Sequence, residues 1–238
     1  MRDKKIWIFN AGNAFDGNPK WLFMYIVNYR KDITSYWFCY TEETRDYIRK
    51  LGYQAFLFKS KMAEKIGSQA GVYVVNQNKE VFQPYLKGIE VLNLWHGVGC
   101  KAIEKNVRSG FLNERVTKKN IINKEVYRNY QLFLVTSPLM EKHFIEQCDL
   151  PKDKIIRAGY PCCFYPGKIK TYDHDILKQK KLPENTKIAV YAPTYRDASA
   201  TNFFSQAIPD MEKVVDVLEK NNFLLIFKMH PLMANDFQ

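Results

Sequence analysis

The sequence predicts an α/β fold in which the strands of a covered parallel sheet alternate with helices. Three observations support this prediction: short apolar or β-branched runs recur along the chain, longer amphipathic stretches separate them, and helix-capping residues precede several of these stretches. Runs that are apolar on both faces of a strand fit parallel sheets covered by helices. Strands that alternate with helices indicate βαβ units.

Six apolar runs in the first part of the chain are predicted strands. They span residues 6–9, 36–40, 55–58, 72–75, 91–95 and 132–136. Between them we expect three helices, each preceded by a side chain that can accept a hydrogen bond from the first turn. These helices span residues 19–30 after Asn18 as cap, 42–50 after Thr41, and 138–148 after Ser137. Proline at the first position of the helix that begins at residue 19 fits this assignment.

A change of composition about two thirds of the way along the chain indicates a join between two modules. We expect a first module at residues 1–165 and a second at residues 166–238. In the second module the pattern predicts strands at 187–192 and 223–227, with a helix at 209–222 between them. Two strands and one helix bury too little apolar surface to fold alone. We therefore expect this module to be incomplete in this chain and to continue in a longer protein.

The composition indicates a globular protein that attracts anions. Hydrophobic residues make up 46% of the chain, enough for a sizeable core, and 36 Lys and Arg against 25 Asp and Glu give a net charge of +11. Such a balance favours nucleotides, polyphosphates, nucleic acid or acidic lipid as partners. Residues 101–128 hold many of the cations. This stretch is either a solvated helix face or a docking surface for an anionic acceptor or a membrane leaflet.

Two further features bear on the cellular compartment. No window approaches the roughly 18 to 20 apolar residues of a membrane-spanning helix, and the apolar run at residues 6–10 is too short for a signal-peptide core. The five cysteines are odd in number and lack C-x-x-C or metal-finger spacing. An odd number of cysteines without such spacing indicates reduced thiols, without disulfides or structural zinc. We therefore expect a cytoplasmic chain.

One histidine stands where a reaction site is expected. His96 comes directly after a predicted strand and is followed by Gly97 and Lys101, and open α/β sheets bind ligands at the carboxyl ends of their strands. An imidazole can accept a proton near neutral pH, and a glycine lets the backbone approach a ligand closely. We predict that His96 is a reaction-site residue; the alternative is a structural histidine. We expect His143 and His174 to be surface residues.

Two more polar clusters follow the predicted strands of the second module. Thr194 and Arg196 come after the first of these strands, and a guanidinium is suited to bidentate contact with phosphate. The alternative for Arg196 is a solvent-exposed pair with Asp197. Lys228 and His230 come after the second strand, where the following proline forces the backbone to extend or turn.

The order and wording of five segments resemble one known family. The segments are F-D-G-N-P-K-W-L at 15–22, W-H-G at 95–97, G-Y-P at 159–161, Y-A-P-T-Y-R-D at 191–197 and K-M-H-P at 228–231. Together they are similar to the CDP-glycerol glycerophosphotransferases, the teichoic acid and capsule polymerases of bacterial envelopes. The resemblance covers nearly the whole chain. It implies a GT-B arrangement, a pair of facing Rossmann-like domains of which the C-terminal one is incomplete in this chain and holds most of the donor nucleotide.

The resemblance also implies roles for individual residues. His96 would be the general base towards the acceptor hydroxyl, His230 would bind or neutralise the donor pyrophosphate, and Arg196 would lie close to the same phosphates. Further substrate-binding positions are Gly97, Lys101, Thr194 and Lys228. Between Gly97 and Lys101 the sequence departs from the family pattern, and the family's acidic and hydroxyl positions for the nucleotide come after Gln238.

The implied reaction transfers glycerol phosphate or ribitol phosphate from a CDP-polyol to a hydroxyl of a lipid-linked or growing polymer, with release of CMP. We expect no cofactor and no metal, because lysine, arginine and histidine can supply the positive charge that the pyrophosphate needs. The expected partners are CDP-glycerol or CDP-ribitol, the polyol-phosphate acceptor, and the anionic inner surface of the membrane, where the protein would bind peripherally.

Two alternatives remain at this stage. A nucleotide-sugar glycosyltransferase of GT-B fold would have the same architecture, since a fold does not choose a reaction. A non-catalytic module could bind an anionic polymer through the stretch at 101–128. Because the sequence contains no RNA- or DNA-binding motif, we expect no nucleic acid partner.

Overall fold

The structure is a computed structural model that describes residues 1–77, 87–99, 102–107, 132–167, 176–193 and 207–229. The chain divides into two compact units, Met1–Lys170 and Thr171–Gln238, and each unit is described by itself. The roles expected for residues 1–165 and 166–238, acceptor side and donor side, stay predictions.

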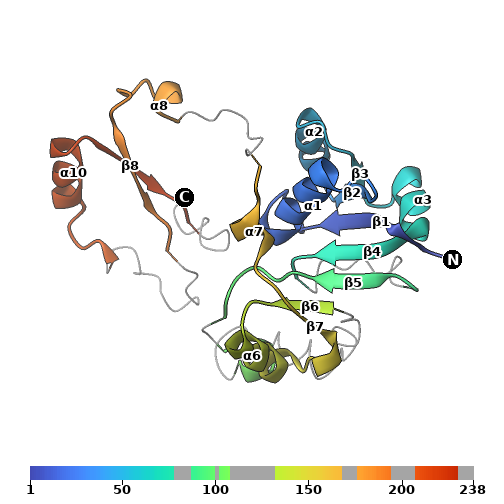
Figure 1. The fold of residues 1–238 in the computed structure, drawn as a ribbon. Helices are drawn as coiled ribbons and strands as arrows, with labels where there is room; N and C mark the ends of the chain where they lie inside the picture. The colour runs from blue at the N-terminus through green and yellow to red at the C-terminus, as the bar shows by residue number, and fades with distance from the viewer. Residues whose placement is uncertain (78–86, 100–101, 108–131, 168–175, 194–206, 230–238) are drawn as a thin grey trace. The chain divides into compact units, whose positions relative to one another are not determined.

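Unit 1 contains a seven-stranded sheet of order β3-β2-β1-β4-β5-β6-β7 (Figure 1), in which every neighbouring pair is parallel. The strands are β1 (Asp3–Asn10), β2 (Thr34–Cys39), β3 (Ala55–Leu57), β4 (Ala70–Val75), β5 (Glu90–Asn93), β6 (Leu132–Val135) and β7 (Ile155–Arg157). The predicted α/β fold with a parallel sheet is therefore confirmed. The strand order reverses direction between β1 and β4, which makes their carboxyl ends the expected place for a ligand.

Helices cover both faces of this sheet. They are α1 (Gly17–Tyr29), α2 (Glu42–Lys50), α3 (Lys61–Gln69), α6 (Pro138–Cys148) and α7 (Pro161–Phe164). Side chains of α1 and α2, such as Phe23 and Ile48, pack with Val74 of β4. Those of α3 pack with Val75, the next residue of the same strand, and α6 covers the same face at β6. Alternate side chains of a strand point to opposite faces, so both faces are apolar.

The helix caps confirm two predictions and correct a third. The hydroxyls of Thr41 and Ser137 accept hydrogen bonds from the first turns of α2 and α6. By contrast, α1 begins at Gly17 rather than at residue 19, and Asn18 lies inside its first turn instead of capping it. The physical reason is that the Asn18 side chain is bonded to the loop after β5. The short helix α3 was not predicted, although Ser60 caps it.

Unit 2 contains the parallel pair β8 (Lys187–Tyr191) and β9 (Phe223–Phe227). It also contains α8 (Ile176–Gln179) and α10 (Met211–Lys220), which begins two residues later than predicted because Asp210 caps it. Tyr191 is the register partner of Phe227, so both strands end at the same edge. Within the described part of either unit, every helix is too short or too polar to cross a membrane.

Candidate functional site

The loop that carries His96 leaves the sheet abruptly at the end of β5. The Leu94 N–H still bonds to the Val75 carbonyl at 2.9 Å, but Trp95 adopts a left-handed φ of +53°. The prediction that the strand runs to residue 95 is therefore wrong. The strand ends early for a local reason. The Asn93 Oδ1 accepts the Trp95 N–H at 2.9 Å, and this hydrogen bond turns the chain out of the sheet. A left-handed residue with a large side chain costs about 1 to 2 kcal/mol.

Burial of the Trp95 indole offsets this cost. The ring is buried against Phe133 and Phe144, with centroid distances of 5.5 and 5.4 Å. The neighbouring His96 is exposed, and its imidazole lies 4.5 Å from the indole, tilted by 48°. The left-handed turn thus sends the tryptophan into the core and leaves the histidine on the surface, where a substrate can reach it.

Two side chains from distant segments hold this loop. Asn18 Nδ2 donates to the carbonyl of Trp95 at 2.8 Å and to that of Leu94 at 3.4 Å. Tyr160 Oη donates to the Gly97 carbonyl at 2.8 Å. Three segments that the sequence places far apart, at 15–22, 95–97 and 159–161, therefore meet at His96. Asn18 and Tyr160 were not predicted as site residues, although both lie inside the segments that carry the resemblance.

Gly97 and Gly99 fit the loop for different reasons. Gly97 has a φ of +154°, and the space where a Cβ would stand is open, so its backbone conformation rather than crowding favours glycine. Gly99 packs closely: its N–H bonds to the Met140 Sδ at 3.3 Å, and a Cβ would stand 2.4 Å from the His143 Nε2. His143 is therefore a half-buried support beneath the loop, which corrects its predicted surface position.

Burial controls the protonation of Tyr160. The side chain is buried, and this burial raises the pKa of its hydroxyl to about 12. The hydroxyl therefore keeps its proton to a higher pH than an ordinary tyrosine does, and it remains a donor to the Gly97 carbonyl over that wider range.

A cation that sequence reasoning did not single out lies on the first turn of α1. The Lys20 ammonium is half-buried over the rings of Phe15 and Trp21, at 5.4 and 5.1 Å from their centroids. Burial lowers the pKa of this ammonium, while the Asp16 carboxylate acts in the opposite direction. The signal that could have identified Lys20 is its place in the F-D-G-N-P-K-W-L segment.

The remaining predicted residues are only partly described. Lys228 is exposed just after β9, and its N–H bonds to the Tyr191 carbonyl at 2.9 Å. Lys101, Thr194, Arg196 and His230 lie outside the described residues, as does most of the stretch at 101–128. The structure thus brings His96 and Gly97 together with Asn18 and Tyr160, but it does not test the predicted donor-side residues.

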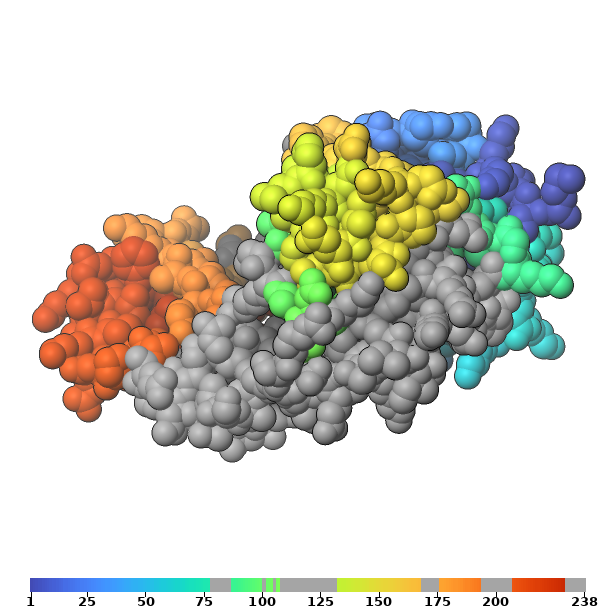
Figure 2. Space-filling model, turned by 90° about the horizontal axis from the view of Figure 1, so that it is seen from below, coloured from blue at the N-terminus to red at the C-terminus, as the bar shows by residue number. Residues whose placement is uncertain are grey.

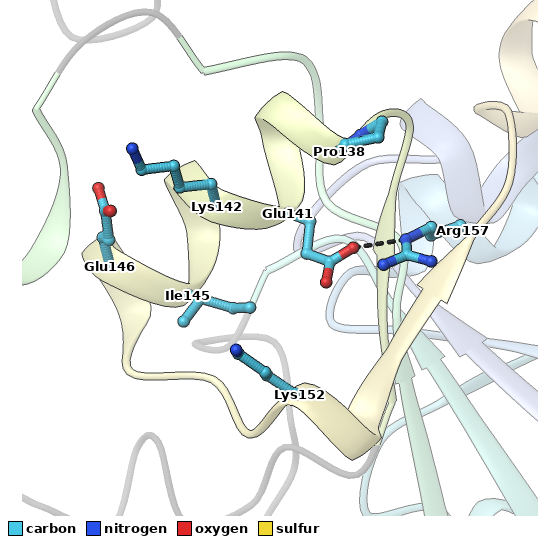
Figure 3. A pocket seen from close by; sticks show the side chains of 7 residues that line it. All are labelled: Pro138, Glu141, Lys142, Ile145, Glu146, Lys152 and Arg157. Carbon is cyan, nitrogen blue, oxygen red and sulfur yellow. Dashed lines mark hydrogen bonds and ion pairs between the residues drawn. The ribbon is translucent and has the colours of Figure 1, made fainter.

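A separate surface pocket of about 330 Å³ lies beside α6 (Figure 3). It is lined by Pro138, Glu141, Lys142, Ile145, Glu146, Lys152 and Arg157. Glu141 and Arg157 form an ion pair at 2.5 Å, so the strongest anion-binding group of the pocket is already matched by a carboxylate. The short helix η3 (Glu104–Asn106) also packs against α6, on the face that Figure 2 shows. The pocket contains none of the predicted residues, and we do not assign the site to it.

Among the residues that the structure describes, His, Cys, Asp and Glu side chains form no group of three or more that could hold a metal ion. The expectation of a site without metal stays a prediction.

A family profile and curated relatives place the chain among the glycerophosphotransferases of teichoic acid synthesis. The family profile described as CDP-glycerol:poly(glycerophosphate) glycerophosphotransferase matches residues 1–238. A teichoic acid glycerol-phosphate primase of Bacillus spizizenii is 30% identical over 151 residues, 61% of this chain and 37% of that protein. A teichoic acid poly(glycerol phosphate) polymerase of the same organism is 22% identical over 258 residues, 99% of this chain and 61% of that protein. This chain thus spans less than two thirds of each relative.

A solved structure supports the same fold. This chain aligns with the structure of the wall teichoic acid polymerase TagF with a TM-score of 0.74 and 20% sequence identity. The alignment covers 100% of this chain and 59% of the TagF chain. At this level of identity the likeness concerns the fold alone.

Proposed function

The chain belongs to the CDP-glycerol:poly(glycerophosphate) glycerophosphotransferase family, and from this premise we propose that it transfers a polyol phosphate in teichoic acid or capsule synthesis. The donor is CDP-glycerol or CDP-ribitol, the acceptor is a hydroxyl of a lipid-linked or growing polyol-phosphate polymer, and CMP is released. The complete enzyme adopts a GT-B arrangement, with the acceptor on the side of unit 1.

The presentation of His96 is the observation that carries this proposal. The imidazole is exposed at the carboxyl edge of a parallel sheet, and Asn18 and Tyr160 hold the loop on which it stands. A structural histidine would need neither the strained turn at Trp95 nor these two hydrogen bonds. An exposed imidazole on a fixed backbone has what a general base requires, because it must lie within hydrogen-bond reach of the hydroxyl that it deprotonates.

The chemistry divides between two groups of residues. His96 takes the proton of the acceptor hydroxyl as its oxygen attacks the β-phosphorus of the CDP-polyol, and the bond from that phosphorus to the oxygen of CMP breaks. Positive charge stabilises the oxygens of the pyrophosphate as negative charge builds on CMP. We assign this task to His230 and Arg196, with further substrate contacts from Gly97, Lys101, Thr194 and Lys228. The proposed reaction uses no metal and no cofactor.

We further propose that the protein works at the inner face of the cell membrane as a peripheral protein. The acceptor is lipid-linked, and the net charge of +11 favours an anionic leaflet. Vesicle flotation tests this step. Binding should increase with the fraction of anionic lipid and decrease with salt, and binding that ignores lipid charge would contradict it.

The central experiment measures nucleotide release by the complete natural protein. CDP-glycerol, CDP-ribitol and a UDP-sugar are each supplied with a polyol-phosphate acceptor, and we expect CMP from a CDP-polyol and no UDP. His96→Ala should lower turnover by about 10² to 10⁴. Because His96 is exposed, the variant should keep the wild-type thermal unfolding curve.

Three outcomes contradict the proposal in different ways. Release of UDP from a UDP-sugar would identify a glycosyltransferase. Wild-type turnover by a folded His96→Ala protein would remove the histidine from the mechanism. Salt-sensitive binding of the polymer without any nucleotide release would identify a non-catalytic binding module.

A further inference from the structure

Asn18 is a buried polar side chain in the first turn of α1. It is only 3% exposed. Its amide nitrogen donates to the carbonyls of Trp95 and Leu94, and its amide oxygen accepts the Cys162 N–H at 3.4 Å. A buried amide costs several kcal/mol unless it is hydrogen-bonded. The three bonds therefore restrict the side chain to one orientation.

The bond to the Trp95 carbonyl acts directly on His96. The carbonyl of Trp95 and the N–H of His96 belong to one planar peptide group. A hydrogen bond of 2.8 Å to that carbonyl therefore fixes the plane from which the His96 backbone begins. The plane needs such a restraint, because the left-handed φ of +53° at Trp95 is less stable than the alternatives open to a bulky residue.

The other bonds of Asn18 tie the loop to the rest of unit 1. Through Cys162 the amide oxygen reaches the first turn of α7, and α7 packs on α1 (Figure 1). Two residues earlier, Tyr160 donates to the carbonyl of Gly97 on the far side of His96. Asn18 therefore fixes the peptide before His96, and the segment that Asn18 contacts fixes the backbone after it.

We propose that Asn18 is a positioning residue for His96: its carboxamide sets the orientation of the peptide that carries the catalytic imidazole. This inference rests on the proposed function for the role of His96 as the general base. The effect on the orientation of the imidazole is independent of that function and can be measured without substrate.

Two substitutions separate positioning from simple packing. Asn18→Ala removes all three hydrogen bonds. Asn18→Asp has nearly the same size and can still accept the Cys162 N–H, but its carboxylate cannot donate and faces two carbonyl oxygens. The matched control is Asn28→Ala on the same helix, whose amide bonds to the Tyr165 hydroxyl at 3.0 Å.

The kinetic part of the test uses the complete natural protein with CDP-glycerol and acceptor. Both Asn18 variants should lower kcat by up to about 10²-fold, because a displacement of about 1 Å in a reacting group costs that much. KM for CDP-glycerol should stay at the wild-type value, and Asn28→Ala should keep wild-type kcat. Wild-type kcat in Asn18→Asp would overturn the proposal.

The spectroscopic part follows the His96 ring by NMR. The protein has four histidines, and His96→Gln assigns the ring signal of His96. We expect one sharp His96 signal in the wild type and in Asn28→Ala, and a shifted or broadened one in both Asn18 variants. Thermal unfolding identifies any variant that is not folded, and Asn18→Asp then decides in place of Asn18→Ala.

The two measurements distinguish failure of the inference from failure of the proposed function. A loss of kcat with an unchanged His96 signal would overturn positioning. If the wild type released no CMP from either CDP-polyol, the proposed function would fail, and the NMR signal alone would decide: a change in both Asn18 variants supports positioning, and no change overturns it.

Discussion

The hydroxyl of Tyr160 offers the most direct test of how the His96 loop is held. Tyr160→Phe keeps the buried ring and removes only the group that donates to the Gly97 carbonyl at 2.8 Å. One hydrogen bond of this kind contributes about 1 kcal/mol to the free energy of unfolding. We expect the variant to lose that amount at pH 8 and to show a lower kcat, because the backbone after His96 is no longer fixed.

The change of the free energy of unfolding with pH tests the same hydroxyl in a second way. Burial raises the pKa of Tyr160 to about 12, whereas an unfolded tyrosine titrates near 10. Between these two values the folded chain keeps a proton that the unfolded chain loses, so stability falls as pH rises. The stabilising contribution is complete below about pH 10 and is lost towards pH 12. A shift of two pKa units corresponds to a loss of at most about 2.7 kcal/mol in the free energy of unfolding over this pH range.

Urea unfolding of both proteins between pH 8 and pH 11.5 measures this difference. The wild type should be more stable by about 1 kcal/mol at pH 8, and above pH 10 this advantage should shrink, vanish and then reverse, because the ionisation of Tyr160 in the unfolded chain outweighs one hydrogen bond. Other tyrosines and lysines titrate equally in both proteins, so they cancel in the comparison. A stability difference that stays constant over the whole range would refute the assigned role of the hydroxyl, as would an unchanged kcat.

Two predictions concern other contacts of the loop and of α6. Gly99→Ala should destabilise the protein because the new Cβ would stand 2.4 Å from the His143 Nε2, and adding His143→Ala should restore part of the loss in urea unfolding. Strict additivity of the two changes would contradict this contact. Ser137→Ala should lower the free energy of unfolding by about 1 kcal/mol, because the hydroxyl caps α6 at the Met140 N–H. An unchanged unfolding midpoint would show that the cap is not needed.

The sheet and its helices were largely predictable from local sequence. All six strands predicted in the first part of the chain occur in unit 1, and the caps at Thr41 and Ser137 form as expected. Such elements follow from apolar patterning and from bonds between near neighbours. The short strand β7 and helix α3 were missed, because few apolar residues mark them and tertiary packing supports them.

The support of the candidate site could not be predicted in the same way. Asn18 has the sequence position of a helix cap, and only its contact with a loop more than seventy residues later explains why it does not cap. Trp95 continues an apolar run, yet the Asn93 side chain turns it out of the strand. His143 lies on a helix with no motif around it, and its role is visible only from the close approach of Gly99.

The way this loop is held has a consequence for how the site forms. Beyond Leu94 the backbone has left the sheet, so its carbonyls need partners that the strand ladder cannot supply. Asn18 comes from the segment after β1, and Tyr160 comes from the segment after β7. The position of His96 therefore depends on the assembly of most of the sheet, because β4, β5 and β6 separate these two strands. A histidine held in this way acquires its geometry only when unit 1 is folded, which ties the proposed reaction to the native state rather than to the W-H-G segment alone.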